Sequence, residues 1–445
     1  MTEWLFRKMS IPQIIVCVYV FLIFIGGFLL YLPIASATGT WTNFMDALFT
    51  ATSAVCVTGQ VTLNTATHWS SFGKTIIIVL IEIGGLGFIT LWMIFFMMRG
   101  LKANIKQRNV LLESLNLSAD FEVKEIVFYI VKFTLLAQLI GAFLLSWAFI
   151  PRLGWLTGSL YAIFHSISAF NNAGFDLFGD SLIGFQDNSF VLLVIAALIV
   201  AGGLGFLVWR DLLTFYRNRR LLRYTKLTLI GTTTLILIGF VLFTISETKQ
   251  GTFKHLSLGD TLSNLLFLSV TPRTAGYANV DYAQLSPLGI FTTLCLMFIG
   301  GSSGSIAGGV KVSTVIIALM CLVRYFSGKP FTLFSRTIKM STIRRALFII
   351  ASALLMVITA TVLLLMTETL PPGVGIEYVL MEVISCMSTV GLTMGLTPHL
   401  TVVGKVILVV LMLMGRVGLM TFLWSIGNHK TQSQINYPEM NIMIG

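Results

Sequence analysis

The sequence has few charged residues for its length. Asp, Glu, Lys and Arg make up 11% of the 445 residues, whereas hydrophobic residues make up 56% and the mean hydropathy is +0.90. A chain of this composition has too little polar surface to cover a soluble globule. The composition therefore excludes the ordinary soluble proteins and predicts a multi-pass membrane protein whose principal partner is the lipid bilayer.

The sequence signatures of enzymes are also missing. The five cysteines form no CxxC pair, and the five histidines form no HExxH or Ser-His-Asp pattern. There is no P-loop, and the glycine-rich strings lie inside apolar runs rather than between a strand and a helix. We therefore expect no enzyme, no catalytic residue, no metal cluster, and no cofactor or nucleotide bound by this chain.

Basic residues outnumber acidic ones and give a net charge of +11. Most of them lie at the amino end and in three connections, 99–125, 210–226 and 324–345, so they form no single patch that would favour nucleic acid. Basic loops of membrane proteins stay on the cytoplasmic side. The pattern predicts cytoplasmic termini, and it predicts that a soluble partner or anionic lipid contacts these three loops.

Long apolar runs supply the expected membrane spans. About 20 apolar residues cross a bilayer as a helix, and eight runs qualify. The first follows Arg7 and Lys8 like a signal peptide, but it is too long for one, and we expect it to be retained. The runs are 12–33, 74–98, 126–150, 189–209, 227–246, 286–323, 346–367 and 402–427.

Four short segments that end in glycine recur along the chain. They read SAVCVTG, SAFNNAG, VTPRTAG and SCMSTVG, and their glycines are separated by 115, 102 and 115 residues. Each segment lies between two apolar runs, and a recurrence of this kind indicates structural repeats. We expect the repeats at 1–100, 101–215, 216–330 and 331–428, followed by a cytoplasmic tail at 429–445.

The repeats predict an all-α membrane fold, with each repeat built as helix, re-entrant pore helix plus filter loop, and helix around a central pore. Irregular backbone at membrane depth is tolerated only where it is buried or lines a water-filled cavity. Four such segments around one axis imply a pore whose carbonyl oxygens replace the hydration shell of a cation. The short pore helices are expected at 44–55, 158–169, 259–270 and 376–387.

Acidic residues stand near the amino ends of three of these pore helices. Asp46, Asp260 and Glu377 are each within a few residues of the expected helix start. A carboxylate there favours the helix dipole. Two roles remain open for them, capping alone or attraction of cations to the outer mouth.

The four unequal filter segments resemble those of the Trk/Ktr/HKT family of potassium transporters. The resemblance covers about 10–428 and is strongest to the bacterial Ktr membrane subunits, through SAVCVTGQ, AFNNAGFD, TPRTAGY and STVGLTMG. It implies potassium uptake through a single-file filter in a bacterial plasma membrane, with sodium activating some members. It also implies a homodimer with one pore per subunit, gated by a KtrA-like cytoplasmic ring that binds ATP or ADP.

The resemblance also assigns the filter residues. All four signature glycines are present, which implies a preference for potassium, because sodium-preferring plant members have serine at the first position. The third segment departs from the others, with Val270 in place of serine and Pro272 and Arg273 before the filter, so we expect its ion site to differ. The expected ion-binding residues are Val57, Thr58, Gly59, Asn172, Ala173, Gly174, Thr274, Ala275, Gly276, Thr389, Val390 and Gly391.

A second glycine motif follows each filter glycine by 24 to 28 residues. It reads GGLGF, GGLGF, GGSSG and GRVGL, and the first two copies are typical of close helix packing. The third lies in the run 286–323, which is too long for one span, and its glycine- and serine-rich centre cannot hold a helix well. We expect a broken helix at this one place, and the resemblance implies that its loop blocks the pore beneath the filter.

The fourth copy of the motif places Arg416 in an apolar helix. A charge at membrane depth is costly and faces the bundle interior or a cavity. Arg416 either pairs with an acid such as Glu82 or faces the cavity under the filter, where it repels cations and binds the loop; we favour the second. Lys311 is expected to reach toward the inner surface. The expected gate residues are Gly300, Gly301, Ser302, Ser303, Gly304, Ser305, Gly308, Gly309, Lys311 and Arg416.

One rival function stays open. An alternating-access carrier for a cation or small solute is also built from repeats and broken helices. Two features of the sequence weigh against it. All four loops enter from the same side, and the expected spans contain few of the ionisable residues that a proton relay needs.

Overall fold

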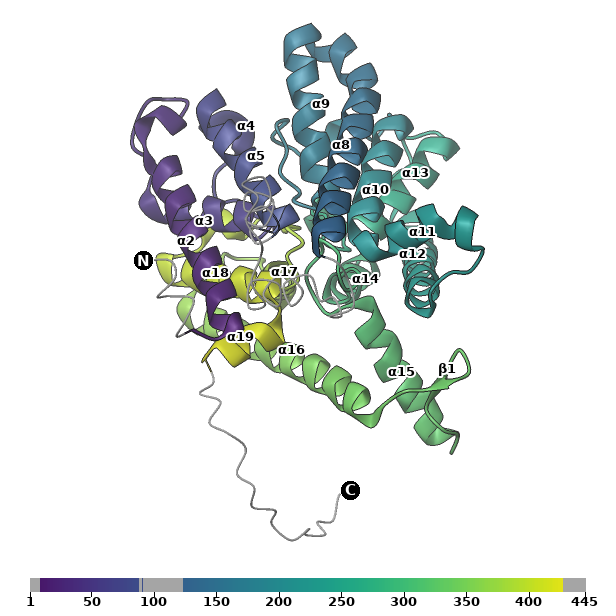
Figure 1. The fold of residues 1–445 in the computed structure, drawn as a ribbon. Helices are drawn as coiled ribbons and strands as arrows, with labels where there is room; N and C mark the ends of the chain where they lie inside the picture. Colours follow the sequence, from purple (N-terminus) through teal and green to yellow (C-terminus); the bar gives the residue numbers. More distant parts are fainter. Residues whose placement is uncertain (1–8, 88–89, 91–122, 427–445) are drawn as a thin grey trace.

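The computed structural model describes residues 9–87, 90 and 123–426 (Figure 1). The predicted tail at 429–445, the first basic residues, and the greater part of the connection 99–125 lie outside the described residues. The described chain is mostly helical, as the sequence predicts. Its one sheet in this part is a two-stranded antiparallel hairpin in the third basic connection, formed by β1 (Thr332–Leu333) and β2 (Arg336–Thr337).

Each repeat begins with a long outer helix. The first, α2, starts at a capping box in which the Ser10 hydroxyl and the Gln13 side chain satisfy each other's backbone N–H groups. By length and composition, these are the four described helices long and apolar enough to cross a membrane. They are α2 (Ile11–Tyr31), α8 (Val123–Leu153), α12 (Arg223–Gln250) and α16 (Met340–Thr367).

A short pore helix follows each outer helix. The four elements confirm the predicted positions to within three residues at either end. Two of them, α3 and α13, begin at side-chain caps, where Asn43 accepts from the Met45 N–H and Ser257 from the Asp260 N–H. The pore helices are α3 (Phe44–Val55), α9 (Trp155–Phe170), α13 (Leu258–Val270) and α17 (Ile376–Met387).

An inner helix completes each repeat, and all four begin in the same way. The N-cap residues Ser70, Asn188, Ser286 and Thr401 each accept the N–H of the residue three positions later. Such a cap satisfies one of the backbone donors that a helix start leaves unpaired. The inner helices are α5 (Ser71–Leu86), α10 (Ser189–Leu204), α14 (Pro287–Phe298) and α18 (Val402–Val417).

The repeats follow one another in a closed ring. The inner helix of each repeat packs on the pore helix of the next, in the pairs α5 with α9, α10 with α13, and α14 with α17, and α18 of the last repeat returns to α3 of the first. In Figure 1 the chain correspondingly passes from purple through teal and green to yellow around the molecule. This cyclic packing brings segments more than 300 residues apart in sequence into contact.

The predicted break in the third inner helix is confirmed, but the prediction that it is the only break is wrong. Helix α14 ends at Phe298 and the span resumes as α15 (Val312–Phe326). The second inner helix also bends by 98° into α11 (Phe206–Asn218), and the fourth bends by 108° into α19 (Leu419–Ile426). The runs 189–209 and 402–427 are therefore not single straight helices.

Glycine with positive φ causes these additional bends. The last glycine of the second motif has φ of +81° at Gly87, +91° at Gly205 and +92° at Gly418. A residue in that conformation cannot continue a right-handed helix, and glycine is the residue that adopts it readily. The signal was present in the sequence as the repeated final glycine of GGLGF and GRVGL.

The first glycine of the motif packs closely, as predicted for the first two copies. A Cβ at Gly84 would fall on the carbonyl oxygen of Val55, and one at Gly202 on that of Phe170. Both carbonyls belong to the last residue of a pore helix. These glycines therefore let an inner helix approach the filter-facing end of its own repeat's pore helix.

Gly202→Ala is expected to lower the melting temperature of the detergent-solubilised protein by several degrees, because the added methyl overlaps the Phe170 carbonyl. Gly203→Ala is the matched control, since its Cβ would meet only the side-chain amide of Asn172, at 3.5 Å. Both changes gain about 1 kcal/mol of helix propensity. Equal melting temperatures for the two variants would contradict the close-packing explanation.

Candidate functional site

The four filter segments have the same backbone conformation. The residue two positions before each filter glycine has a positive φ although it is not glycine: +58° at Val57, +57° at Asn172, +76° at Thr274 and +51° at Thr389. Non-glycine residues rarely adopt this region, and such strain concentrates at functional sites. The filter glycines have φ of +88°, +69°, +75° and +95° in chain order. One strained turn thus occurs four times.

A backbone hydrogen bond closes this turn in three repeats. The N–H just before the glycine donates to the carbonyl of the serine five residues earlier, at 2.8 Å in each of the pairs Thr58 to Ser53, Ala173 to Ser168 and Val390 to Ser385. In the third repeat Ala275 donates instead to Thr271, at 3.0 Å. The third turn therefore closes on threonine where the sequence has Val270 in place of serine.

The filter glycines join the four segments into a ring. At each of them a Cβ would overlap the carbonyl oxygen that precedes the glycine of the next segment. Gly59 lies against Ala173, Gly174 against Ala275 at 2.6 Å, Gly276 against Val390, and Gly391 against Thr58. The last contact returns to the first segment, so the ring is closed. Carbonyls from four segments converge where only glycine fits, which is the kind of arrangement that binds a dehydrated cation.

The pore helices point their carboxyl ends at this ring. Each ends within four to six residues of its filter glycine: α3 at Val55, α9 at Phe170, α13 at Val270 and α17 at Met387. A helix carboxyl end has a partial negative charge. Four such ends around one ring favour a cation there.

The loop 299–311, between α14 and α15, packs against the fourth filter segment. A Cβ at Gly308 would overlap the Thr389 hydroxyl, and one at Gly309 would lie 3.2 Å from the Ser388 Cβ. The loop is held at its base by a Gly300 N–H to Val310 carbonyl bond of 2.9 Å. It thus contacts a filter turn directly.

The second repeat and the outer helix of the loop's own repeat hold the loop in place. The Ser302 N–H donates to the carbonyl of Gly203 at 3.1 Å, and the Phe206 N–H donates to the carbonyl of Gly304 at 3.2 Å. The Tyr224 hydroxyl donates to the carbonyl of Ser303 at 2.5 Å. The break between α10 and α11 is therefore the place where the second repeat binds the loop, which explains why a bend is needed there.

Arg416 links the loop to the first repeat. Its guanidinium donates to the carbonyl of Ile306 in the loop and to the carbonyls of Gly84 and Gly85 at the end of α5. Among the described residues no carboxylate forms a salt bridge with it. Glu82, the predicted acidic alternative, instead accepts from Gln138 and Asn171 at 2.8 and 2.6 Å.

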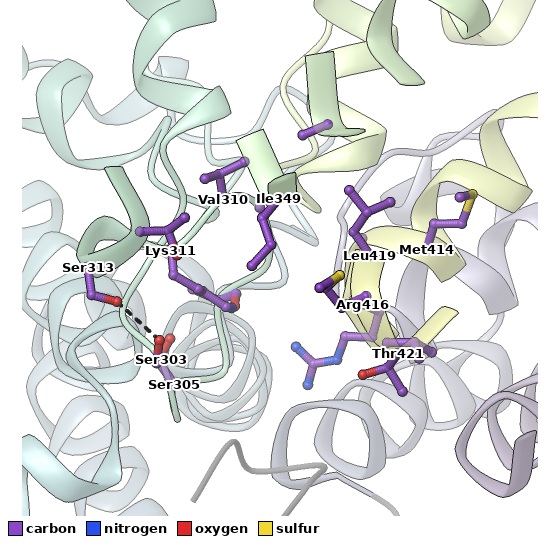
Figure 2. Close-up of a pocket in the computed structure, with 18 of the residues that line it drawn as sticks. Ser303, Ser305, Val310, Lys311, Ser313, Ile349, Met414, Arg416, Leu419 and Thr421 are labelled. Atoms are coloured by element: carbon purple, nitrogen blue, oxygen red, sulfur yellow. Dashed lines mark hydrogen bonds between the residues drawn. The ribbon is translucent and has the colours of Figure 1, made fainter. Parts of the chain in front are cut away.

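Lys311 does not extend as the sequence favoured. Its ammonium donates back to the carbonyl of Ala307 within the loop. With Arg416 it lines a cavity of about 420 Å³ under the loop. Figure 2 shows Lys311, Ser303 and Ser313 on one side of this cavity and Arg416 and Thr421 on the other. The hydroxyls of Ser303 and Ser313 are 3.3 Å apart.

The acidic residues near the pore-helix starts have structural partners. Asp46 forms a 2.8 Å ion pair with Lys405 of α18, and both side chains are largely buried. Asp260 accepts hydroxyls of Ser257 and Ser189 at 2.6 Å each. These contacts support a helix-end and packing role for the two carboxylates.

Sequence reasoning missed two buried polar residues on the pore helices, His165 and Glu382, both 0% exposed. Each lies nine positions before its filter glycine. That common offset was the signal available in the sequence. Each of the two side chains forms a hydrogen bond with the chain just after the filter.

The chain is similar in sequence to known cation transport proteins. The TrkH family, described as cation transport protein, matches residues 8–426. The chain is 46% identical to the potassium/sodium uptake protein NtpJ of Enterococcus hirae, over 99% of this chain and 98% of that protein. It is 39% identical to the Ktr system potassium uptake protein B of Bacillus subtilis, over 98% and 96%.

A solved structure has the same fold. The potassium transporter TrkH from Vibrio parahaemolyticus superposes with a TM-score of 0.71 at 19% identity, covering 94% of this chain and 86% of that one. The likeness in fold therefore extends over nearly the whole chain.

Proposed function

Because the chain belongs to the TrkH family of cation transport proteins, we propose that it takes up potassium through the ring of filter segments. The observation that carries this proposal is the closed set of contacts among the four filter glycines and the preceding carbonyls. Rings of backbone carbonyls select potassium by replacing its water shell. We propose the carbonyls of the filter residues predicted from the sequence as the ion-binding groups, and 1–100, 101–215, 216–330 and 331–428 as the four repeats.

Gating is assigned to the loop 299–311 with Arg416. The loop contacts the fourth filter segment, and Arg416 ties it to α5. A guanidinium beside the pathway also raises an electrostatic barrier to cations. For the pore to open, the loop must break its hydrogen bond to Arg416, or Arg416 must move together with the loop.

Regulation is assigned to a second protein. Relatives of this chain are named as parts of a Ktr system, and this chain has no phosphate-binding motif. We propose a homodimer in the plasma membrane with both termini cytoplasmic, contacted at its basic loops by a nucleotide-binding ring. Sodium is proposed as an activating ion, and one relative is named for both potassium and sodium.

The test is uptake by cells that lack their own potassium systems, with rubidium as tracer and sodium as competitor. Potassium-dependent growth and rubidium uptake that excess sodium inhibits poorly are expected. An alternating-access carrier would differ by showing counterflow of preloaded rubidium and saturation at a low turnover. A chain that reaches the membrane but supports no potassium or rubidium uptake would refute the proposal.

A further inference from the structure

One position on each pore helix is equivalent in all four repeats and differs in chemistry. It lies nine residues before the filter glycine and is occupied by Thr50, His165, Phe267 and Glu382. Among the described residues, Thr50 donates to the Asp46 carbonyl of its own helix, and Phe267 has no polar atom in its side chain. His165 and Glu382 instead bind the chain that runs outward after the filter, here called the outer return.

Glu382 binds the outer return of its own repeat with both oxygens. Oε1 accepts the Thr393 hydroxyl at 2.5 Å, and Oε2 accepts the Thr397 hydroxyl at 2.7 Å. An ionised carboxylate is an acceptor at both oxygens, and hydrogen bonds to a charged group are short and strong. Two hydroxyl donors on a completely buried side chain therefore fit a carboxylate.

The same carboxylate also fixes the outer return of the first repeat. Gln60 directly follows Gly59, and its Nε2 donates to the Thr397 Oγ1 at 2.8 Å. The Cys386 thiol, one turn along α17 from Glu382, donates to the Gln60 Oε1 at 2.7 Å. The first and fourth filters are neighbours in the ring, because Gly391 packs on the Thr58 carbonyl.

These bonds run in one direction. The thiol donates to Gln60, Gln60 donates to Thr397, and Thr397 donates to Glu382. If the Gln60 amide were reversed, Thr397 would have to donate to Gln60, and Oε2 would lose its hydroxyl donor. The carboxylate thus determines how the first residue after Gly59 is oriented.

His165 occupies the equivalent place in the second repeat, opposite the fourth in the ring order. Its Nε2 accepts the Leu177 N–H at 3.3 Å, and its Nδ1 lies 2.7 Å from the Tyr161 carbonyl. The N–H can only donate and the carbonyl can only accept, so the ring is neutral with its proton on Nδ1. The second outer return is therefore also held from this position, without charge.

We propose that Glu382 is a specificity-determining positioning residue of the filter, which holds the outer returns of the fourth and first segments in the spacing that favours potassium over sodium. This inference rests on the proposed potassium uptake. Glu382 does not touch the ion; it acts through Thr393, Thr397 and Gln60. Its loss widens or loosens two neighbouring segments, and the smaller sodium ion is then rejected less well.

The experiment measures rubidium uptake by the full-length protein in potassium-uptake-deficient cells, and the sodium concentration that halves it. Glu382→Gln keeps the side-chain volume, but an NH2 group that cannot accept a hydrogen bond replaces one of the two carboxylate oxygens. We expect the ratio of this sodium concentration to the KM for rubidium to fall about tenfold below the wild-type ratio, a change equal to about 1.4 kcal/mol. The maximal rate of uptake should stay within about threefold of the wild-type rate. Thr50→Val, at the equivalent position of the first pore helix, where the hydroxyl donates to a carbonyl of its own helix, is the control and keeps the wild-type ratio.

A second pair of variants decides the matter if Glu382→Gln folds poorly. Thr397→Val removes the hydroxyl with little change of shape and is expected to lose selectivity as Glu382→Gln does, whereas Thr397→Ser keeps the hydroxyl and the selectivity. A wild-type ratio in both Glu382→Gln and Thr397→Val overturns the inference and leaves potassium uptake standing. Absence of rubidium uptake by the wild-type protein overturns the proposed function, and the inference with it.

Discussion

Gly391→Ala is expected to abolish selective potassium uptake. Gly391 has φ of +95°, and its Cβ would overlap the Thr58 carbonyl, which is one of the proposed ion ligands. The left-handed conformation alone costs alanine about 1–2 kcal/mol, and the overlap must in addition push a filter carbonyl out of the ring. We expect rubidium uptake to fall by about tenfold or more, since each 1.4 kcal/mol is a factor of ten, with the remainder poorly selective against sodium.

The same segment supplies the matched control for this variant. Gly395 also has a positive φ, +91°, but no atom lies within 4 Å of the Cβ that alanine would add. Gly395→Ala therefore causes the backbone strain without the overlap. If both variants lost uptake equally at equal membrane levels, strain rather than the filter ring would be the cause. If both retained it, the ring would not be the ion pathway.

Arg416→Ser is expected to raise potassium flux. The variant removes the donors to Ile306 of the loop and to Gly84 and Gly85 of α5. Hydrogen bonds from a charged donor contribute about 1.5–3 kcal/mol each, so losing the bond to the loop shifts the closed–open equilibrium about tenfold or more toward open. The measurement is rubidium flux into proteoliposomes that contain the purified protein, at equal protein content.

Arg345→Gln tests whether a positive charge in the cavity limits flux when it forms no hydrogen bond to the loop. Arg345 lines the same cavity from α16 but is exposed, and no hydrogen bond from it to the loop 299–311 is among those of the described residues. We expect this variant to change flux less than twofold. Arg416→Lys keeps the charge but not the planar fork that reaches three carbonyls, and it should fall between wild type and Arg416→Ser. Unchanged flux in a well-folded Arg416→Ser protein would remove this residue from the gate.

The composition and the recurring glycine segments could be interpreted without coordinates. Hydrophobic content identified the bilayer, and the spacing of the glycine segments led to the pore helices, which the structure has at the expected places. The break within 286–323 was also predictable, because a run rich in glycine and serine cannot form a continuous helix. The bends after α10 and α18 were not predicted, although Gly205 and Gly418 lie at the same place in their motifs.

Side-chain partners were less accessible to this reasoning. Arg416 was expected to bind the loop, and its bonds to Gly84 and Gly85 could not be foreseen. Lys311 was expected to extend and folds back instead. Glu382 was overlooked because its contacts are not local in sequence. Its partner Thr397 lies 15 residues after it, and Gln60, which Thr397 links to it, lies 322 residues before it.

The sequence by itself determined that this protein spans the membrane, that it is built from four repeats, and that each repeat has a short helix ending before a glycine. Those properties follow from local composition, periodicity and the conformational freedom of glycine. Only the tertiary structure decided the order of the ring, the carbonyl against which each glycine packs, and the residues that hold the loop and the outer returns. These contacts join distant segments, and which atoms meet is set by how the repeats pack around their common axis.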